Sequence, residues 1–212
     1  MLDAVLQLVV EEAMAVREIV QVGHPVLRQH ARALTPEELA SPQVQQLIVD
    51  MRETMRAAPG VGLAAPQIGV PAQVVVIEDP KEFHEGFTAE QLAARERTPV
   101  DYHVLVNPKL TVLGDEKVPH FEGCLSFATF SMVVARHRKV RVDALDEHGR
   151  PFSRTAVGWY ARILQHEVDH LHGTVCCDRM DPRTLTTPDN YSRHYAGKTI
   201  AEAKAIIGKP AQ

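Results

Sequence analysis

The sequence predicts an α+β fold in which antiparallel sheets pack around one central helix that carries the pattern H-E-x-x-H. The region from residue 102 to 157 alternates apolar and polar residues, as half-buried strands do. Residues 159–172 instead show helical periodicity and end at Gly173, a residue suited to a helix C-cap. A chain of 212 residues with 45% hydrophobic residues is large enough to build one compact core.

The first segment, residues 1–18, is predicted to be an N-terminal helical extension. Its apolar residues fall on one helical face over residues 2–16: Leu2, Val5, Leu6, Val9 and Val10. We expect this helix to lie outside the main domain, as a docking arm or as the contact of a homodimer.

Two helices follow, because Thr35-Pro36 and Ser41-Pro42 each join a helix-capping residue to a proline suited to the first helical turn. They predict a short turn of helix over 36–40 and a longer helix over 42–57. Residues 60–70 contain three glycines and a proline, which predicts a shaped loop without a regular element. Residues 71–79 then return to a strand-like pattern.

The remaining elements are an excursion, a series of strands and two helices. Residues 80–101 are polar and contain a short helical stretch, and a hairpin turn is predicted at residues 146–149. After the helix over 159–172, residues 174–180 predict a short strand, and residues 200–207 a last helix. We therefore divide the chain into the extension 1–18, a catalytic domain 19–185 and a C-terminal tail 186–212 with a short helix.

Composition narrows the function classes. A formal net charge of −4, with scattered Lys and Arg, provides no basic surface for nucleic acid. No run of 18 apolar residues is present that would span a bilayer. Asp3, Glu11 and Glu12 precede the first arginine, which is typical of neither a secretory signal nor a transit peptide. We expect a cytoplasmic, bacterial-type protein, or one of an organelle matrix if a transit peptide has been removed.

The predicted central helix contains His166-Glu167-Val168-Asp169-His170. Histidines four residues apart project from the same helix face and can hold one metal ion. Glu167, beside the first histidine, can reach a water molecule at that ion and act as general base. The pentapeptide predicts a metal centre that still needs a third protein ligand.

Two cysteines compete for the third position. Cys124 follows Gly123, whose backbone freedom helps to present a thiolate, and this set leaves one position open. Cys176 completes the spacing H-E-x-x-H-x-x-G-x-x-C, which is that of metzincin proteases with Cys in place of the third His, and would make the protein a zinc endopeptidase. Cys176 precedes Cys177 in an apolar stretch that suits small core residues, so we favour Cys124.

Three motifs, taken together, resemble a known family. GVGLAAPQ at 60–67, EGCLS at 122–126 and QHEVDHLHG at 165–173 resemble the signature motifs of peptide deformylases, in the same order. The similarity extends over about residues 20–183. It implies that Cys124, His166 and His170 bind a metal and that Glu167 acts as general base and then acid.

The same resemblance implies the rest of the site. The Gln67 amide and the Leu125 N–H would donate to the oxyanion formed when a metal-activated water attacks the formyl group of an N-formylmethionyl nascent peptide, releasing formate. The ion would be Fe(II) in the cell, with Zn(II), Ni or Co in purified protein. The substrate would meet the chain near the ribosome. Its extended backbone would pair with the segment Gly60, Val61 and Gly62, and its methionine pocket would be walled by Trp159 and Ile163.

Three neighbouring features carry further expectations. Asp169 is predicted to pair with Arg136, and Glu122 to brace the cysteine loop. Arg162 lies on the pocket face of the helix, where an arginine is unexpected, and either walls the pocket or turns outward. After Ser126 the sequence FATFSMVVAR offers no substrate-binding basic residue before its final arginine.

Overall fold

The computed structural model describes residues 15–208 of the chain. The helix predicted over residues 2–16 falls almost entirely outside this range and stays a prediction. The helices are α1 (Pro36–Leu39), α2 (Pro42–Ala57), α3 (Ala89–Arg95), α4 (Gly158–Leu171), α5 (Pro188–Asn190) and α6 (Ile200–Ile207). The strands are β1 (Gly62–Ala64), β2 (Val74–Asp79), β3 (Val100–Val112), β4 (Lys117–Gly123), β5 (Ser131–His137), β6 (Lys139–Leu145) and β7 (Pro151–Val157).

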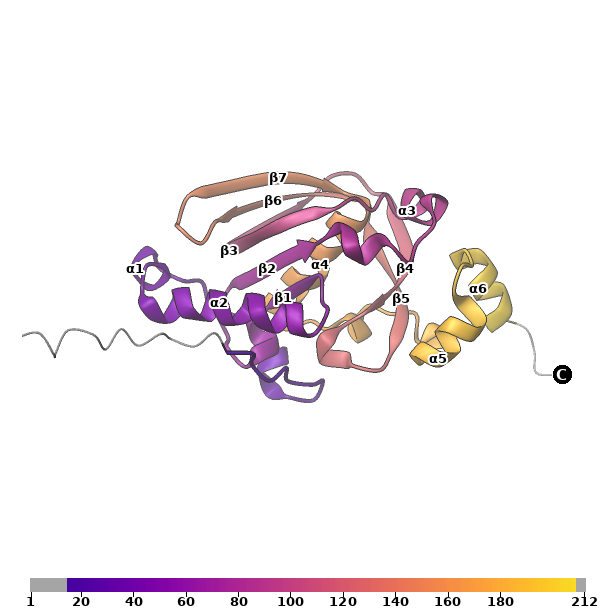
Figure 1. The fold of residues 1–212 in the computed structure, drawn as a ribbon, viewed down its shortest axis with the longest axis horizontal. Coiled ribbons are helices and arrows are strands. Elements are labelled where there is room, and N and C mark those ends of the chain that lie inside the picture. Colours follow the sequence, from indigo (N-terminus) through magenta and orange to yellow (C-terminus); the bar gives the residue numbers. More distant parts are fainter. Residues whose placement is uncertain (1–14, 209–212) are drawn as a thin grey trace, which may run out of the picture.

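Two antiparallel sheets form the framework (Figure 1). The larger has five strands in the order β1-β2-β3-β6-β7, and β4 pairs with β5 in a separate two-stranded sheet. Every pairing between these strands is antiparallel. The predicted mixture of helices and antiparallel sheets is therefore confirmed.

The five-stranded sheet is covered on both faces, which explains the continuous apolar run of β2. Val75 and Ile77 pack with residues of α4, including Leu164. Val74 and Val76 point the other way and pack with residues of α2 and β1. Because side chains alternate along a strand, a strand between two helices needs apolar residues at successive positions.

Local capping fixes the helix limits that the sequence predicts. The side chains of Thr35 and Ser41 accept hydrogen bonds from the backbone N–H groups of Glu38 and Val44, at the starts of α1 and α2. After α4, Gly173 has φ +71°, and a Cβ there would lie 2.7 Å from the Arg28 carbonyl oxygen. A glycine at this position therefore lets the end of α4 pack against the backbone of Arg28.

Two local predictions are wrong. The segment predicted as a loop over 60–70 contains β1, because its extended backbone pairs with β2 from Gly62 to Ala64. The segment predicted as a strand over 174–180 contains a 3-10 turn, Cys176–Asp178. The Asp178 carboxylate accepts the Val175 N–H at 2.8 Å, so a local turn satisfies the backbone where a strand would need a partner.

The polar excursion and the tail lie beside the two-stranded sheet (Figure 1). A buried ion pair, Arg97 to Asp79 at 2.7 Å, joins the ends of the excursion, and α3 lies between them as predicted. In the tail, α6 contacts β4. Within residues 15–208, no helix has the length and apolar character needed to cross a membrane.

Candidate metal centre and active site

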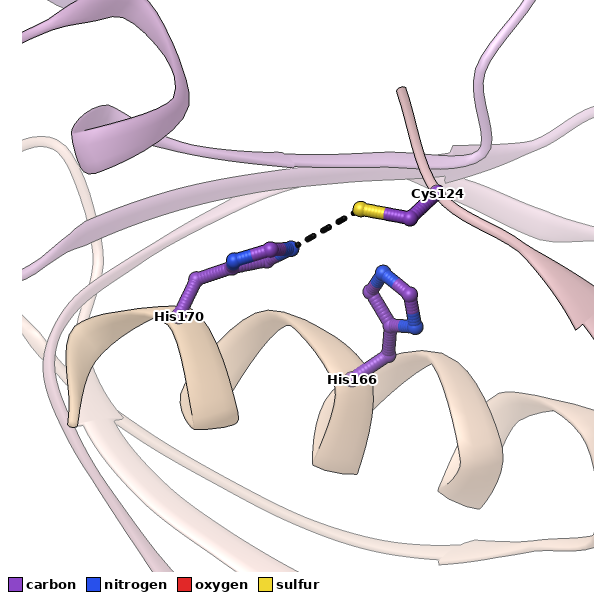
Figure 2. Close-up of side chains that lie close together, drawn as sticks. All are labelled: Cys124, His166 and His170. Atoms are coloured by element: carbon purple, nitrogen blue, oxygen red, sulfur yellow. Dashed lines mark hydrogen bonds between the residues drawn. The ribbon is translucent and has the colours of Figure 1, made fainter. Parts of the chain in front are cut away.

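One group of metal-binding side chains converges in the described part of the chain. The sulfur of Cys124 and one ring nitrogen from each of His166 and His170 lie within 4.8 Å of one another (Figure 2). Cys124 Sγ is 3.3 Å from His170 Nε2. Two imidazoles and a thiolate are a donor set that suits Zn(II) and Fe(II), so the three residues fit a divalent metal.

The fold brings these residues together from two elements. His166 and His170 are one turn apart on the same face of α4. Cys124 directly follows β4, with an extended backbone (φ −141°, ψ 135°). The helix sets the histidine pair locally, whereas the sheet positions the cysteine 42 residues earlier in the sequence.

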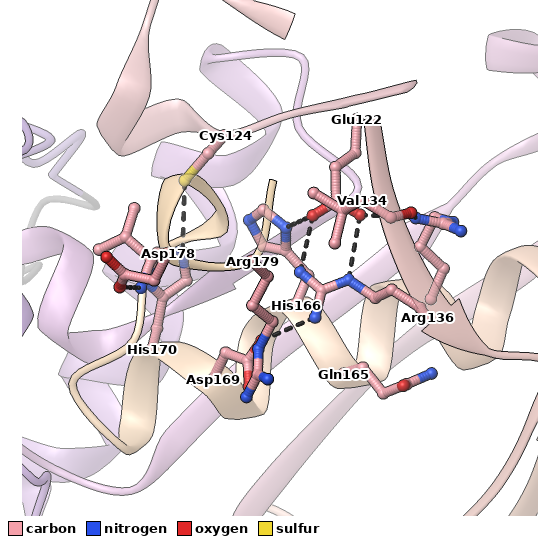
Figure 3. A network of polar contacts seen from close by, with 12 residues as sticks. Glu122, Cys124, Val134, Arg136, Gln165, His166, Asp169, His170, Asp178 and Arg179 are labelled. Carbon is pink, nitrogen blue, oxygen red and sulfur yellow. Dashed lines mark hydrogen bonds and ion pairs between the residues drawn. The ribbon is translucent and has the colours of Figure 1, made fainter. Parts of the chain in front are cut away.

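Glu122 joins the metal centre to a buried charged network (Figure 3). Its carboxylate accepts hydrogen bonds from Arg136 at 2.6 and 3.0 Å and from Arg162 at 2.9 Å. It also lies 3.1 Å from His166 Nδ1, which leaves Nε2 of that ring for a metal. Arg136 continues to Asp169 at 2.7 Å, which confirms the predicted pair. Arg162 turns inward, with 4% of its surface exposed.

The network changes the pKa values at its centre. Burial works to raise the pKa of Glu122, but His166 and Arg136 hold it well below its usual range. Burial alone would lower the pKa of His166, whereas the Glu122 hydrogen bond and charge raise it to about 8. Burial lowers the pKa of His170, which favours the neutral imidazole that binds metals.

The two buried cysteines influence each other. A hydrogen bond with the Cys176 thiol, together with burial, raises the pKa of the Cys124 thiol. The same bond lowers the pKa of Cys176. A bound cation would act against the first effect, because a coordinating thiol loses its proton. Cys176 thus interacts with Cys124, but it is the Cys124 sulfur that converges with the two histidines.

Glu167 is enclosed beside the three residues that could hold a metal. Burial raises its pKa to about 7. Its Oε2 is shielded from solvent and has no hydrogen-bond partner among the described residues. A Cβ on Gly62 would lie 2.4 Å from Glu167 Oε1, so only glycine leaves room for the carboxylate there. The Oε1 side of the carboxylate is therefore packed against Gly62, whereas Oε2 remains available to a ligand.

The Gln67 side chain has a fixed orientation. Its Oε1 accepts the Ala64 N–H at 2.9 Å, so its Nε2 points towards Cys124. That nitrogen lies 3.8 Å from Cys124 Sγ and 3.4 Å from Ser126 Oγ. The Gln67 amide is thus a donor of fixed orientation next to Cys124, one of the three residues that could hold a metal.

A cavity of about 450 Å³ opens onto this centre. Of the residues that the sequence predicts for the site, all except His170 line it: Gly60, Val61, Gly62, Gln67, Cys124, Leu125, Trp159, Ile163, His166 and Glu167. His170 is almost wholly buried beside Cys124. Segments from four parts of the chain thus border one cavity.

Gly62 of β1 and the residues just before it border the cavity, and β1 is an edge strand of its sheet. The Val61 carbonyl accepts the Glu78 N–H at 3.1 Å, and Gly62 pairs in register with Ile77. Because hydrogen-bonded and non-bonded pairs alternate in antiparallel sheets, the N–H and C=O of Gly62 point away from β2. This edge can accept an extended peptide as an added strand.

The sequence analysis missed two features of the site. It expected Glu122 to brace the cysteine loop, but not to contact His166 and two arginines, as the structure shows. The sequence also gave no indication that Gln21 binds the turn after Cys124. Its side chain donates to the Leu125 carbonyl at 3.0 Å and accepts the Ala128 N–H at 3.2 Å.

Comparisons with known proteins agree on one family. The family model described as polypeptide deformylase matches residues 16–185. Peptide deformylase 1A, chloroplastic/mitochondrial, of Arabidopsis thaliana is 48% identical over 173 residues, which are 82% of this chain. The chain spans only 64% of that relative's length. Peptide deformylase 1 of Streptomyces coelicolor is 43% identical over 202 residues, covering 94% of this chain and 90% of the relative.

Solved structures lead to the same family. A class I type b peptide deformylase from Acinetobacter baumannii, solved with Met-Ala-Ser bound, has a TM-score of 0.69 at 30% identity and covers 79% of this chain and 99% of its own. The Ehrlichia chaffeensis peptide deformylase, in complex with actinonin, has a TM-score of 0.68 at 34% identity, covering 79% and 90%. With this sequence match, fold and set of metal-binding side chains, the chain belongs to the peptide deformylase family.

Proposed function

We propose that this protein is a metal-dependent hydrolase that removes the formyl group from the N-terminal formylmethionine of new polypeptides and releases formate. One observation carries the proposal: Cys124, His166 and His170 converge beside the free carboxylate oxygen of Glu167, in a cavity bordered by an edge strand. The Met-Ala-Ser bound to the Acinetobacter baumannii relative has the form of a deformylated product, which supports the same reaction here.

The proposed mechanism is hydrolysis of a linear amide. When bound, the metal ion polarises the formyl oxygen and makes a water molecule more acidic. Glu167 accepts a proton as the water oxygen bonds to the formyl carbon. It then returns this proton to the methionine nitrogen as the C–N bond breaks, giving formate and a free N-terminus. No covalent bond to the protein forms.

Two donors are proposed to stabilise the negative charge that develops on the formyl oxygen. The Gln67 Nε2 group already points towards Cys124, and the Leu125 N–H follows Cys124 in the chain. Donors fixed in advance are most effective in a buried site, where removal of one costs about 3–4 kcal/mol of transition-state stabilisation. The support for this role is the fixed orientation of the Gln67 amide.

The substrate is proposed to bind as an extended peptide along β1. Gly60, Val61 and Gly62 would receive its backbone, and Gly62 presents outward-pointing N–H and C=O groups for this purpose. Trp159 and Ile163 would wall the methionine pocket from α4. In this proposal α4 is the central metal-binding helix around which the sheets pack, which accords with its contacts to β1, β2, β3, β5, β6 and β7.

The cofactor we propose is one divalent ion, Fe(II) in the cell and Zn(II), Ni or Co in protein as purified. Two imidazoles and one thiolate accommodate each of these ions. Activity that is lost in air and kept under anaerobic conditions would support iron, because oxygen attacks both Fe(II) and a reactive thiolate. Equal activity with zinc would contradict it.

The alternative, a zinc endopeptidase with Cys176 as third ligand, is not favoured. Cys176 is buried and lies outside the converging group formed by Cys124 and the two histidines. The family comparisons contain peptide deformylases and supply no support for cleavage of internal peptide bonds.

The remaining proposals concern organisation and setting. We propose residues 19–185 as the catalytic domain, supported by the family match over 16–185, with 1–18 and 186–212 as appended segments. The partners would be nascent N-formylmethionyl peptides close to the ribosome, with a homodimer formed through the N-terminal extension. The location would be the cytoplasm of a bacterial-type cell or an organelle matrix, since the relatives include both kinds.

The experiment that tests this function is formate release from formyl-Met-Ala-Ser by anaerobically prepared protein. The matched control is Glu167→Ala, which removes the proposed base and leaves the three ligands in place. We expect release by the unaltered chain and a loss of at least about 100-fold in the variant, at equal metal content. Absence of release from metal-loaded protein would refute the proposal.

A further inference from the structure

The Trp159 side chain lines the cavity and is contacted by an arginine from the excursion over residues 80–101. The guanidinium carbon of Arg97 lies 5.4 Å from the centre of the indole ring. Arg97 is not among the residues that line the cavity, and the proposed function gives it no role. A guanidinium within about 6 Å of an indole ring is attracted to it electrostatically. The excursion therefore contacts a side chain of the proposed methionine pocket.

A second contact fixes the Arg97 guanidinium. It donates two hydrogen bonds to the Asp79 carboxylate, at 2.7 and 2.8 Å. Both partners are buried, with 7% of the Arg97 side chain and 1% of the Asp79 side chain exposed. A bidentate pair fixes the plane of a guanidinium as well as its position. Asp79 is the last residue of β2, so the five-stranded sheet determines where this arginine lies.

The excursion also packs against the first turn of α4. Gly158 begins the helix with φ +61°, and a Cβ there would lie 2.4 Å from Glu96 Cβ and 2.7 Å from the Arg95 carbonyl oxygen. Only glycine fits where the end of α3 meets the residue before Trp159. Glu96 in turn accepts hydrogen bonds from Arg138, between β5 and β6, at 2.5 and 2.7 Å. These contacts hold the segment that directly precedes the arginine on the indole.

The indole depends on its ring contacts for its orientation. Its Nε1 is shielded from solvent and has no hydrogen-bond partner among the described residues. Besides Arg97, the ring has His120 at its edge, with the two centroids 6.0 Å apart, and the Arg162 guanidinium at 5.7 Å. Arg162 is already bound to Glu122 at 2.9 Å. The contact with Arg97 is therefore the one through which the excursion can hold Trp159 in place.

We propose that Arg97 is a positioning residue, which holds the Trp159 indole as a wall of the methionine pocket while Asp79 fixes the guanidinium. This inference rests on the proposed function. Arg97 lies outside the cavity lining, so it acts on the substrate through the indole. In this way an excursion remote from the metal centre in the sequence contributes to the recognition of formylmethionine.

The first readout is fluorescence, because Trp159 is the only tryptophan of the chain. The protein is used in its zinc-loaded form. In Arg97→Ala we expect emission at longer wavelength and at least about twofold stronger quenching by acrylamide, because an indole without its guanidinium neighbour meets more water. Arg97→Lys should show a smaller change, because an ammonium keeps the charge beside Asp79 but lacks the planar group that pairs twice and stacks.

The second readout is formate release from formyl-Met-Ala-Ser and formyl-Ala-Ala-Ser. For the methionine peptide, Arg97→Ala should raise KM about tenfold and change kcat less than about twofold, because a pocket wall contacts the side chain and not the reacting group. The alanine peptide offers little side chain to that wall, so its kcat/KM should change less than about twofold. The two peptides thus separate a displaced pocket wall from a general loss of activity.

Arg95→Ala is the matched control. Arg95 belongs to the same excursion, and its guanidinium carbon lies 5.1 Å from the centre of the Phe87 ring, as that of Arg97 lies at 5.2 Å. Within the described residues, however, Arg95 forms no ion pair with Asp79 and does not lie over the Trp159 ring. The control should leave the fluorescence and both KM values unchanged.

The outcomes separate the inference from the proposed function. Unchanged fluorescence, an unchanged KM for the methionine peptide, or an equal loss on both peptides in Arg97→Ala would overturn the inference and leave deformylation intact. If Arg97→Ala does not fold, Arg97→Lys decides by the same criteria. Failure of the unaltered chain to release formate from either peptide would instead refute the proposed function.

Discussion

Replacing Glu122 by Gln tests whether the buried network supports the metal centre. The carboxylate is 7% exposed and binds two arginines and His166. Glutamine keeps the size of the side chain but removes its charge, so Arg136 and Arg162 remain buried with less compensation. Breaking a buried ion pair by removing one partner costs about 3–5 kcal/mol. Arg136 keeps Asp169, so we expect a loss near the lower end, about 3 kcal/mol, in the free energy of unfolding.

The measurement is urea unfolding at pH 7 with and without the metal, combined with metal competition. If His166 binds the metal as proposed, loss of its contact with Glu122 should weaken metal binding by about 10- to 100-fold. Glu96→Gln is the control, because the Glu96–Arg138 pair is exposed on both sides and should contribute under about 1 kcal/mol. A loss below about 1 kcal/mol with unchanged metal affinity in Glu122→Gln would refute the reasoning.

The pH dependence of this effect has a definite sign. The folded protein holds the pKa of Glu122 well below its usual value of 4.5, so the folded state binds the proton more weakly than the unfolded state. The stabilisation is thus fully present above about pH 4.5 and is lost as the pH falls through the folded-state pKa. The difference in stability between the unaltered chain and Glu122→Gln should shrink in that acidic range.

Two further predictions concern the proposed metal ligands and the proposed general base. Gly62→Ala places a Cβ 2.4 Å from Glu167 Oε1, so we expect the carboxylate to shift and kcat to fall about 100-fold at unchanged metal content. Steady-state kinetics with metal analysis will check this, and an unchanged kcat would contradict it. Cys176→Ser should retain the metal and the activity, whereas Cys124→Ser should lose both. Metal analysis of the two purified variants distinguishes them, and the reverse result would favour the endopeptidase.

Much of the fold followed from local patterns. The caps Thr35 and Ser41 fixed α1 and α2, and the helical periodicity after residue 158 fixed α4 to within one residue at each end. These features depend on residues a few positions apart, so the sequence contains the whole signal. The strand β1 escaped prediction because the glycines of residues 60–70 indicate a loop, and only pairing with β2 makes the strand extended.

The sequence by itself determined that His166 and His170 share one helix face, with Glu167 beside the first of them. The reason is that residues four apart in a helix lie one above the other on the same face. Only the tertiary structure decided that the Cys124 sulfur meets them while Cys176 stays outside that group. It also decided that Glu122 joins His166 to two arginines, and that Arg97 lies over the Trp159 ring. These contacts join residues far apart in the chain, and their geometry depends on how the sheets pack against α4.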